Sequence, residues 1–539
     1  MSFLEGMMGT RIKIKVEFEE YEVSNESVTA PSKEDDGSFV IEFPTAFEGD
    51  IDMCEQAVLA ANYPAIREAI SQHLERISKK KTEERNRELT GRGGDEGIRG
   101  REVEYRVDGE VGRFTFTTHE VVADEKVVFK STDMFPPQQG TAYYLTRGFR
   151  ELGMLRGATE ASYRKVCKRL NRQRRQEEGG TPLNTLRDAT EAEGKRVLDS
   201  FAVKTATVLE AQGVDENHPP TPELCETPER IVQESELSRA EVSKAFAEVE
   251  IPEALQDEVA SNPVPYERPE ESVSICADGV LAKKQQEKRR RPGGTEPPVK
   301  SGDKKKERLN HKTATIEHTG KRYTLVAATY VTLFRTILAF VLNNGLQQLR
   351  LCFFTDGEKS LKNALVEAFS WHPAIFVILD WHHIEKKCGE RLSMALRGRK
   401  LRNEHLAQVT RLLWYGATSS AIDYLRQIPA RHIKAPDYID KLCAYLEDRR
   451  SMIPCYAIRK QLGLRNSSNA VEKANDELVS ARQKHQGMSW SEEGSLALAA
   501  LSVVNRNRHQ RPWLEGRVIP FTLDPTSDES VQQALDNAA

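Results

Sequence analysis

The stretch "RLCFFTDGEKSLKNALVEAF", residues 350–369, sets the pattern for the C-terminal half of the chain. Its apolar run at 351–354 predicts a buried strand, and the Thr-Asp-Gly that follows predicts a turn into a helix ending near Phe369. A second apolar run, 375–379, also ends on an aspartate, Asp380, in "AIFVILDWHH". Two neighbouring strands therefore each deliver an aspartate, Asp356 and Asp380.

The elements before this stretch predict the rest of a sheet. "SVSICADGVLAK" (272–283) predicts a strand that ends near Asp278, and "TATIEHTGKRYTLVAAT" (313–329) predicts two strands joined by a His-Thr-Gly turn. "YVTLFRTILAFVLNNG" (330–345) predicts a helix that stops at its last glycine. Strand, strand, strand, helix, strand, helix, strand is the element order of a ribonuclease-H-like core. In that fold the first and fourth strands are adjacent, so we expect Asp278 to lie beside Asp356.

Two carboxylates that lie side by side repel each other unless a cation lies between them. Oxygen ligands select Mg²⁺ or Mn²⁺ over softer metals. Two such ions can activate an oxygen that attacks a phosphodiester and stabilise the oxygen that leaves. A third carboxylate is expected on a later helix, and the best candidate is Glu472 in "NSSNAVEKANDELVS", with Glu477 as the alternative. The predicted catalytic and metal-binding residues are Asp278, Asp356 and Glu472.

The segment "TDGEKSLKNALVEAFSWHPAIFVILDWHH" resembles the second-aspartate block of Mutator-type and related bacterial insertion-sequence transposases. "NAVEKANDELVSARQKHQGMSWSEEGSLALAAL" is similar to their glutamate helix and C-terminal segment. The resemblance covers about residues 270–510. It implies a DDE transposase that cleaves and joins DNA strands at the ends of a mobile element with two Mg²⁺ or Mn²⁺ ions per active site. The implied partners are double-stranded DNA, both element ends and target, and further copies of the chain, since joining two ends needs at least a dimer.

One position departs from the family pattern. Relatives often hold a Cys or His after the following strand, two residues ahead of a His, whereas Asp380 takes the first of these places and His383 the second. Two interpretations stay open for these auxiliary residues. Asp380 is either a fourth carboxylate near the metal ions or a cap at the strand end that orients His383.

The interval between Asp356 and Glu472 is longer than one strand and a short helix require. The excess, about residues 389–459, has helical periodicity in "EHLAQVTRLLWYGATSSAIDYLRQI" and "YIDKLCAYLEDRRSM". An all-helical insertion before the glutamate is what Mutator-like relatives carry, so this interval agrees with the resemblance.

Charge is distributed unevenly along the chain. Residues 145–175 hold ten Lys or Arg against two Glu, residues 215–258 hold thirteen Asp or Glu against three Lys or Arg, and residues 283–312 hold twelve Lys or Arg against four acids. Two basic blocks separated by an acidic one indicate a polyanionic partner and a spacer that is kept away from it.

The first basic block predicts a DNA-binding helix-turn-helix. "YYLTRGFRELGMLRGATEASYRKVCKRLNRQRRQEEGG" indicates a helix, a turn at Gly157 and a second helix that begins near Thr159. The second helix would bury Tyr163, Val166 and Leu170 and turn a basic face to DNA. A basic loop between the first two core strands would grip the DNA backbone. The predicted DNA-binding residues are Arg164, Lys165, Lys168, Arg169, Arg172, Arg174, Arg175, Lys304, Lys305 and Lys306.

The N-terminal segment alternates apolar and polar residues in "RIKIKVEFEEYEV" and in "EVEYRVDGEVGRFTFTTHEVV", where Asp-Gly indicates a hairpin. The fold class predicted is therefore multidomain α/β, with a ribonuclease-H-like core and a helical insertion, preceded by a helix-turn-helix domain and an N-terminal α+β domain. The predicted parts are 1–130 (α+β), 131–212 (helix-turn-helix), 213–268 (acidic, Pro-rich linker), 269–388 with 460–515 (catalytic core), 389–459 (helical insertion) and 516–539 (tail).

Eight scattered cysteines without a CxxC pair exclude a zinc ribbon and a disulfide framework, and no apolar stretch is long enough to predict a membrane span. We therefore expect a cytoplasmic, nucleoid-associated bacterial protein with no membrane role. Three alternatives to a transposase remain: a non-catalytic DNA-binding protein derived from one, a ribonuclease-H-fold nuclease that cuts structured nucleic acid without joining it, and a Mg²⁺-dependent small-molecule phosphoryl hydrolase. The absence of a Gly-rich phosphate loop and the two basic blocks count against the last.

Overall fold

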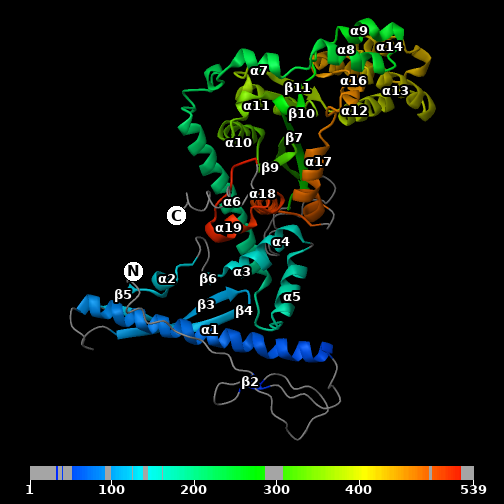
Figure 1. The fold of residues 1–539 in the computed structure, drawn as a ribbon. Helices are drawn as coiled ribbons and strands as arrows, with labels where there is room; N and C mark the ends of the chain where they lie inside the picture. The colour runs from blue at the N-terminus through cyan, green and yellow to red at the C-terminus, as the bar shows by residue number, and fades with distance from the viewer. Residues whose placement is uncertain are drawn as a thin grey trace, which may run out of the picture. The chain divides into compact units, whose positions relative to one another are not determined.

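The chain divides into two compact units, an N-terminal unit at Met1–Thr190 and a C-terminal unit at Glu191–Ala539 (Figure 1). Both units combine sheets with helices, so the prediction of a multidomain α/β protein is confirmed. The finer domain boundaries stay predictions. The computed structural model describes residues 32–33, 39–40, 51–90, 99–123, 126–137, 144–160, 162–285, 307–484 and 488–523.

The N-terminal unit is built on a four-stranded sheet with the order β5-β4-β3-β6. The predicted hairpin is present, and its turn consists of Glu110 and Val111 because Gly109 pairs with Gly112. Gly112 has a φ of 121°, which only glycine adopts readily. The strand predicted at residues 11–23 lies outside the described residues. The strands are β1 (Ser32–Lys33), β2 (Phe39–Val40), β3 (Arg99–Gly109), β4 (Gly112–Ala123), β5 (Lys126–Phe129) and β6 (Tyr144–Leu145).

Helix α1 (Ile51–Thr90) lies along β4 and supplies hydrogen bonds to its backbone. The Ser71 hydroxyl donates to the Thr115 carbonyl at 3.0 Å, and the Thr117 N–H donates to Glu75 at 2.9 Å. One turn further, the His119 N–H donates to Ser78 at 2.9 Å. Helical spacing of short polar residues thus satisfies backbone groups that an uncovered strand would leave open to another chain.

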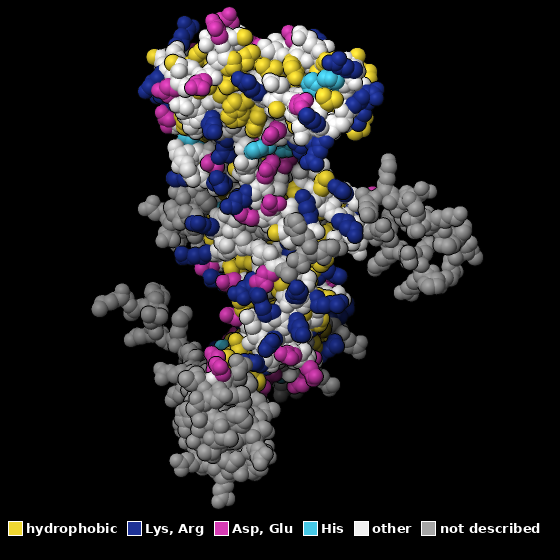
Figure 2. All heavy atoms as spheres, turned by 90° about the vertical axis from the view of Figure 1, so that its right-hand side faces the viewer, with side chains coloured by type: hydrophobic (Ala, Val, Ile, Leu, Met, Phe, Trp, Pro, Cys, Tyr) yellow, Lys and Arg dark blue, Asp and Glu magenta, His cyan; other side chains and the backbone are white. Residues whose placement is uncertain are grey.

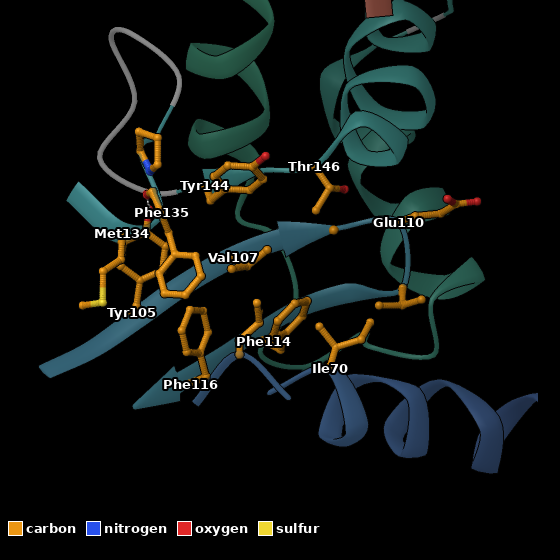
Figure 3. A pocket seen from close by; sticks show the side chains of 14 residues that line it. Ile70, Tyr105, Val107, Glu110, Phe114, Phe116, Met134, Phe135, Tyr144 and Thr146 are labelled. Atoms are coloured by element: carbon orange, nitrogen blue, oxygen red, sulfur yellow. Dashed lines mark hydrogen bonds between the residues drawn. The ribbon is translucent and has the colours of Figure 1, made fainter. Parts of the chain in front are cut away.

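The sheet also encloses an apolar cavity of about 600 Å³ (Figure 3). Its walls are mostly aromatic: the Tyr105 ring lies 5.5 Å from that of Phe116, and Phe135 meets Phe116 edge-on at 5.2 Å. The Tyr105 hydroxyl donates to the Phe135 carbonyl, so its polar end is satisfied. Ile70 of α1 and Tyr144 of β6 complete the wall.

Two helical segments follow the sheet, and they correct the predicted helix-turn-helix boundaries. The first runs without interruption through α3 (Arg147–Phe149), the π-helix η2 (Arg150–Leu155) and α4 (Arg156–Thr159). Gly157 is therefore inside a helix and not at the turn. The second helix, α5 (Tyr163–Gln173), begins after Ser162, whose hydroxyl accepts from the Lys165 N–H.

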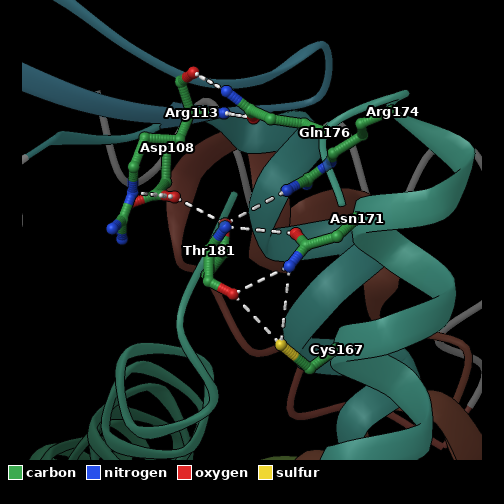
Figure 4. A network of polar contacts seen from close by, with 7 residues as sticks. All are labelled: Asp108, Arg113, Cys167, Asn171, Arg174, Gln176 and Thr181. Atoms are coloured by element: carbon green, nitrogen blue, oxygen red, sulfur yellow. Dashed lines mark hydrogen bonds and ion pairs between the residues drawn. The ribbon is translucent and has the colours of Figure 1, made fainter. Parts of the chain in front are cut away.

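A buried polar network attaches α5 to the β3–β4 hairpin (Figure 4). The Asp108 carboxylate is fully buried, forms an ion pair with Arg113 at 2.9 Å and accepts from the Thr181 hydroxyl at 2.6 Å. Asn171 of α5 donates to the Thr181 carbonyl and accepts from its N–H. Gln176 bonds both the N–H and the carbonyl of Arg113. These bonds fix the orientation of α5, and therefore of the side chains on its outer face.

The C-terminal unit contains a five-stranded sheet with the order β11-β10-β7-β8-β9. Strands β7, β8 and β9 are antiparallel, and the Thr319-Gly320 turn between β8 and β9 is the one predicted. Strands β10 and β11 join on the other side of β7 and run parallel to it. The strands are β7 (Ser272–Lys283), β8 (Arg308–His318), β9 (Lys321–Ala327), β10 (Arg350–Thr355) and β11 (Ile375–Leu379).

The two faces of this sheet are covered by different helices (Figure 1). On one face Phe353 of β10 packs against Phe334 of α10 (Tyr330–Asn343) and Phe369 of α11 (Lys359–Phe369), with ring centroids 6.1 and 5.1 Å away. On the other face Cys276 and Phe354 join the core of the helical insertion. The sheet is buried on both sides, as the continuous apolar runs of β10 and β11 predict.

Every described element between β11 and α17 is helical, which confirms the predicted helical content of residues 389–459. The segment predicted as an acidic linker is instead packed: its apolar side chains form a core with Cys455 and Ile458, and Glu267 forms a buried ion pair with Arg459 at 2.6 Å. The described cysteines are all free and buried. Among the described helices, none combines the length and apolarity needed to cross a bilayer. The remaining helices are α2 (Ser131–Met134), α6 (Leu183–Ala211), η3 (Pro222–Leu224), α7 (Pro228–Glu234), α8 (Arg239–Glu248), η4 (Glu253–Leu255), α9 (Gln256–Ala260), η5 (Pro269–Glu271), η6 (Leu346–Gln348), α12 (Trp381–Ala395), α13 (Arg399–Trp414), α14 (Thr418–Arg426), η7 (Ala430–His432), α15 (Asp437–Asp448), η8 (Arg450–Met452), α16 (Tyr456–Gln461), α17 (Asn469–Asn475), η9 (Asp476–Lys484), α18 (Glu492–Arg506) and α19 (Gln510–Gly516).

Candidate active site

Asp278 and Asp356 occupy equivalent positions on two adjacent parallel strands. Cys276 of β7 pairs with Phe354 of β10, and each aspartate follows its strand's member of that pair by two residues. Paired strands lie about 4.8 Å apart. The register therefore brings the two carboxylates to neighbouring positions.

Asp278 is inside β7 and not at its end, which corrects the prediction. The strand continues to Lys283 because β8 continues beside it, with Asp278 opposite Thr313 and Gly279 opposite Lys312. In the sequence alone, Asp278-Gly279 has the residue types that end a strand. The segment that pairs with the continuation of β7 lies about thirty residues later in the chain.

Hydrogen bonds hold the Asp278 carboxylate from two sides. The Gly279 N–H donates to Oδ1 at 2.7 Å, and the Asn475 side-chain amide of α17 donates to Oδ2 at 2.8 Å. The Thr313 hydroxyl donates to Asn475 Oδ1, which turns the amide NH₂ toward the aspartate. Each carboxylate oxygen retains a further acceptor site.

The Asp356 turn is held by a residue of the helical insertion. Asp356 Oδ1 accepts from the Glu358 N–H at 2.8 Å, and Gly357 has a φ of 79°. Arg449 donates to the Gly357 carbonyl at 2.8 Å, and a Cβ on Gly357 would lie 2.6 Å from Arg449 Nε. Glycine is required here both for its left-handed backbone and for this close approach.

The two candidates for the third carboxylate have different neighbours. Glu472 lies exposed on α17 one turn before Asn475, and its charge contributes to raising the pKa of Asp278. Glu477 forms an ion pair with Arg506.

Asp380 has the contacts of a cap that also positions a second helix. Its buried carboxylate accepts from the His383 N–H at 2.9 Å and lies 3.2 Å from His383 Nδ1, so it caps the start of α12. It also accepts from the N–H of Ser468 and, at 2.9 Å, from the Ser468 hydroxyl. Ser468 immediately precedes α17, so Asp380 fixes the start of the helix that carries Glu472. This geometry favours the orienting interpretation of Asp380 over a fourth carboxylate.

The ionisation of the site follows from burial and from the nearby charges. Burial, with the charges of Asp356 and Glu472, raises the pKa of Asp278 to about 6, although the Gly279 N–H and His383 oppose this. The hydrogen bond to Asp380 raises the pKa of His383 above its usual value, and the charges of Asp356 and Asp278 add to this. The neighbouring carboxylates therefore favour the protonated form of His383.

Burial alone would raise the pKa of Asp380, but hydrogen bonds from His383 and Ser468 lower it to about 2. At a pH near 6, Asp380 is therefore ionised while Asp278 is partly protonated. The two carboxylates differ because Asp380 accepts more hydrogen bonds and is paired with a histidine.

The donor set of the site suits a hard divalent cation. Asp278, Asp356 and Glu472 form no ion pairs with the described basic residues, and carboxylate oxygens are the ligands that Mg²⁺ and Mn²⁺ prefer. Across the described stretches, no three His, Cys, Asp or Glu side chains already stand at ligand distance from a common point. These three carboxylates are the residues that would hold Mg²⁺ or Mn²⁺.

The basic face predicted on α5 is present in part. Tyr163, Val166 and Leu170 are buried as predicted, and Figure 2 shows Lys and Arg side chains gathered on the face where α5 lies. The exposed basic residues of the helix are Arg164, Lys165, Lys168, Arg169 and Arg172. One of them, Arg169, forms an ion pair with Glu160.

Arg174 is wrongly assigned to the DNA-binding face. Its side chain is 2% exposed, its guanidinium lies 5.1 Å from the centre of the Phe149 ring, and burial lowers its pKa to about 10. Helical spacing ends at Gln173, so the side chain turns inward where the sequence pattern continues outward. Arg175 is half-buried with a φ of 51°. Lys304, Lys305 and Lys306 lie outside the described residues.

Several residues of the site were not identified from the sequence. Asn475 was detectable in principle, because it follows Glu472 by three positions and so shares its helix face. Thr313 was not, because its place opposite Asp278 depends on the register of β8 against β7. No family model matches the chain, and a comparison with curated proteins finds no match.

We predict that Asp278→Asn flattens the pH dependence of stability of the C-terminal unit. Because the pKa of Asp278 is raised, its protonated form favours folding, and that contribution is present below its unfolded pKa of 3.8 and lost as pH rises through about 6. The wild-type free energy of unfolding should therefore fall by about 3 kcal/mol more than that of the variant over this interval. All five tryptophans lie in the C-terminal unit, so tryptophan fluorescence during urea unfolding with EDTA reports on it.

Asp423→Asn, on an exposed face of α14, is the control. Equal slopes in wild type and Asp278→Asn would contradict the prediction.

We predict the opposite pH behaviour for Asp380. Asp380→Ala leaves the Ser468 and His383 donors unpaired and should lower the free energy of unfolding by about 3 kcal/mol at pH 7. The stabilisation is present above the unfolded pKa of 3.8 and is lost as pH falls through about 2. The same fluorescence measurement applies, with Asp423→Ala as control. A variant as stable as wild type would show that the carboxylate is not a structural cap.

Proposed function

We propose that this chain is a DDE transposase that cuts DNA at the ends of a mobile element and joins the freed ends to target DNA. The observation that carries the proposal is the parallel register that sets Asp278 beside Asp356, with the charge of Glu472 acting on the same carboxylate. Adjacent carboxylates without basic partners are the arrangement that phosphodiester chemistry with divalent cations requires.

The sheet supports this proposal at the level of fold. The order β9-β8-β7-β10-β11, with three antiparallel strands followed by two parallel ones, matches the order of a ribonuclease-H-like core. The helical segment between β11 and α17 occupies the place of the insertion found in Mutator-like transposases. The same segment contributes Arg449, which holds the Asp356 turn.

Each side chain of the site has a definable task in such a reaction. Asn475 and the Gly279 N–H orient the Asp278 carboxylate, and Thr313 orients Asn475. Mg²⁺ or Mn²⁺, when bound, would lower the pKa of the attacking water or 3′ hydroxyl and offset the charge of the phosphate. Without a cation, burial raises the pKa of Asp278 to about 6, and a divalent cation bound there would favour the ionised carboxylate.

His383 and Asp380 act beside this carboxylate pair. The contact with Asp380 raises the pKa of His383, which favours a positively charged ring near Asp356 and Asp278. Such a donor can bond a phosphate oxygen or protonate a leaving oxygen. Asp380 is a positioning residue, because its contacts are to His383 and to Ser468 at the start of α17.

The exposed basic side chains of α5 are the proposed contact to the element ends. A buried apolar seam and the network of Asp108, Thr181 and Asn171 hold the helix, while its cations face outward. A helix fixed in this way can contact phosphates or enter a major groove. The proposed complex contains at least two copies of the chain, because two ends must be joined.

We predict that the chain nicks duplexes from the DNA that flanks its own gene when Mg²⁺ or Mn²⁺ is present. Asp356→Asn and Glu472→Gln should each lower the cleavage rate about a thousandfold, since each removes a ligand from the site. Labelled duplexes tiled across both flanks, incubated with a supercoiled target plasmid, measure nicking and strand transfer in one reaction. Glu477→Gln is the matched control, because Glu477 pairs with Arg506, and it should remain active.

Other outcomes distinguish the alternatives. Cleavage without insertion into the plasmid would indicate a ribonuclease-H-fold nuclease. Tight binding to flank duplexes without cleavage in either metal would indicate a DNA-binding protein derived from a transposase. Loss of activity in Glu477→Gln but not in Glu472→Gln would identify Glu477 as the third carboxylate.

We predict that α5 supplies part of the affinity for DNA. Replacing Arg164, Lys168 and Arg172 with Ala removes three exposed cations and should weaken duplex binding. It should also reduce the slope of log Kd against log salt by about 2 to 3, because each lost phosphate contact removes about 0.9. Fluorescence anisotropy with flank duplexes over a salt series measures both quantities.

The matched control removes three exposed basic residues from α6, Arg187, Lys195 and Lys204, so the change in net charge is the same. Its slope should stay at the wild-type value. If both triple variants reduce the slope equally, binding follows net charge alone and α5 is not a specific contact.

A further inference from the structure

A lysine of α12 and a tyrosine of α15 meet beside the candidate active site. Lys387 follows His383 by one turn of α12, so the two side chains share a face of that helix. Tyr445 belongs to α15, which packs against α12. The Lys387 Nζ lies 6.0 Å from the centre of the Tyr445 ring, at the outer limit of a cation–π contact. The two side chains thus come together across the seam between α12 and α15.

Two observations place the Tyr445 ring next to the Asp356 turn. The Arg449 guanidinium lies 4.3 Å from the centre of the ring, and the same guanidinium donates to the Gly357 carbonyl at 2.8 Å. Burial raises the pKa of Tyr445 to about 12, and the charges of Asp356 and Asp380 add to this although Arg449 opposes it. The hydroxyl is therefore within electrostatic range of the carboxylates and keeps its proton at neutral pH.

The face of α12 that carries Lys387 is the one turned toward these carboxylates. The pKa of His383 is raised by its hydrogen bond to Asp380, and the charges of Asp356 and Asp278 add to this. The His383 ring therefore lies within electrostatic range of both aspartates. Residues four apart on an α-helix differ by about 40° around the axis and about 6 Å along it. Lys387 thus continues the His383 face one turn further from the site.

Both side chains have donors that the folded chain leaves open. Among the described residues, no carboxylate lies within ion-pair distance of the Lys387 ammonium, and no acceptor bonds the Tyr445 hydroxyl. Arg449 is already engaged, by the Gly357 carbonyl and by an ion pair with Asp448 at 2.9 Å. Lys387 and Tyr445 are each partly buried. A partly buried ammonium without an anion, next to a hydroxyl without an acceptor, favours a ligand with negatively charged oxygens.

We propose that Lys387 and Tyr445 bind a phosphate of the DNA strand next to the phosphate that is held at Asp278 and Asp356. This inference rests on the proposed function and adds a substrate-binding pair to it. A lysine ammonium is a compact point charge suited to a phosphate oxygen, and a protonated tyrosine hydroxyl donates to a second one. Because Lys387 lies one turn beyond His383, the contact is to a neighbouring phosphate and not to the one that is cleaved.

The test measures binding of the full-length chain to a duplex from the gene's flank in Ca²⁺, a hard cation that oxygen ligands hold, by fluorescence anisotropy over a salt series. Lys387→Met keeps the apolar stem and should weaken binding about tenfold and lower the salt slope by about 0.9. Tyr445→Phe keeps the ring and removes no charge, so it should weaken binding about threefold at an unchanged slope.

Lys400→Met is the matched control, because it removes the same charge. Lys400 is exposed at the start of α13, beyond the C-terminal end of α12, whose 15 residues span about 22 Å. This variant should keep the affinity and the salt slope of wild type. A wild-type slope in Lys387→Met, or an equal reduction in Lys387→Met and Lys400→Met, would overturn the proposal.

A second measurement identifies the phosphate. In a duplex series, each phosphodiester in turn is replaced by an uncharged methylphosphonate. Neutralising the linkage that Lys387 contacts should weaken wild-type binding but have little further effect on Lys387→Met, so the two changes are non-additive there. That linkage should lie within about two nucleotides of the nick made in Mg²⁺, because one helical turn spans about 5.4 Å. Additive effects at every linkage, or coupling only far from the nick, would overturn the proposal.

Urea unfolding followed by tryptophan fluorescence separates binding from folding. Lys387→Met and Tyr445→Phe should unfold at the wild-type midpoint, because each keeps most of the packing atoms. A lowered midpoint in Lys387→Met would assign the lysine a structural role over the Tyr445 ring and overturn the proposal. Because the readout is binding, a wild-type chain that shows the coupling in Ca²⁺ but nicks no duplex in Mg²⁺ or Mn²⁺ would refute the proposed function and leave the phosphate contact standing.

Discussion

The parallel pairing of β10 with both β7 and β11 is the constraint on which the site depends. In this register Asp278, inside β7, and Asp356 and Asp380, which follow β10 and β11, occupy corresponding positions on three adjacent strands. Burial, with the charges of Asp356 and Glu472, raises the pKa of Asp278. The neighbouring groups divide the three aspartates into different tasks.

Asp380 differs from the other two because it accepts more hydrogen bonds. Four donors from His383 and Ser468 converge on it and keep it ionised, and in doing so they connect the end of β11 to the start of α17. The helical insertion lies between those two elements in the chain. Its length is accommodated because Asp380 joins its two ends, while Arg449 returns from it to the Asp356 turn. The insertion is thus attached to the site at both ends.

Much of this could be predicted from residue patterns alone. The strands and helices around Asp356, the hairpin in the N-terminal unit and the helical insertion follow from local periodicity and turn residues, which act over a few neighbouring positions. Patterns failed where partners are distant in sequence. Asp278 was placed at a strand end because residues 308–312, which pair with 279–283, were counted as part of the basic loop. Arg174 was placed on the surface because the Phe149 ring that covers it lies in another helix.

The sequence by itself determined which segments are strands and helices, and which acidic residues follow apolar strands. Only the tertiary structure decided which partner each acidic residue meets. Glu477 pairs with Arg506, and Glu472 acts on Asp278. The reason is physical: periodicity is a property of neighbouring residues, whereas charge compensation and burial depend on which distant segments the sheet register brings together.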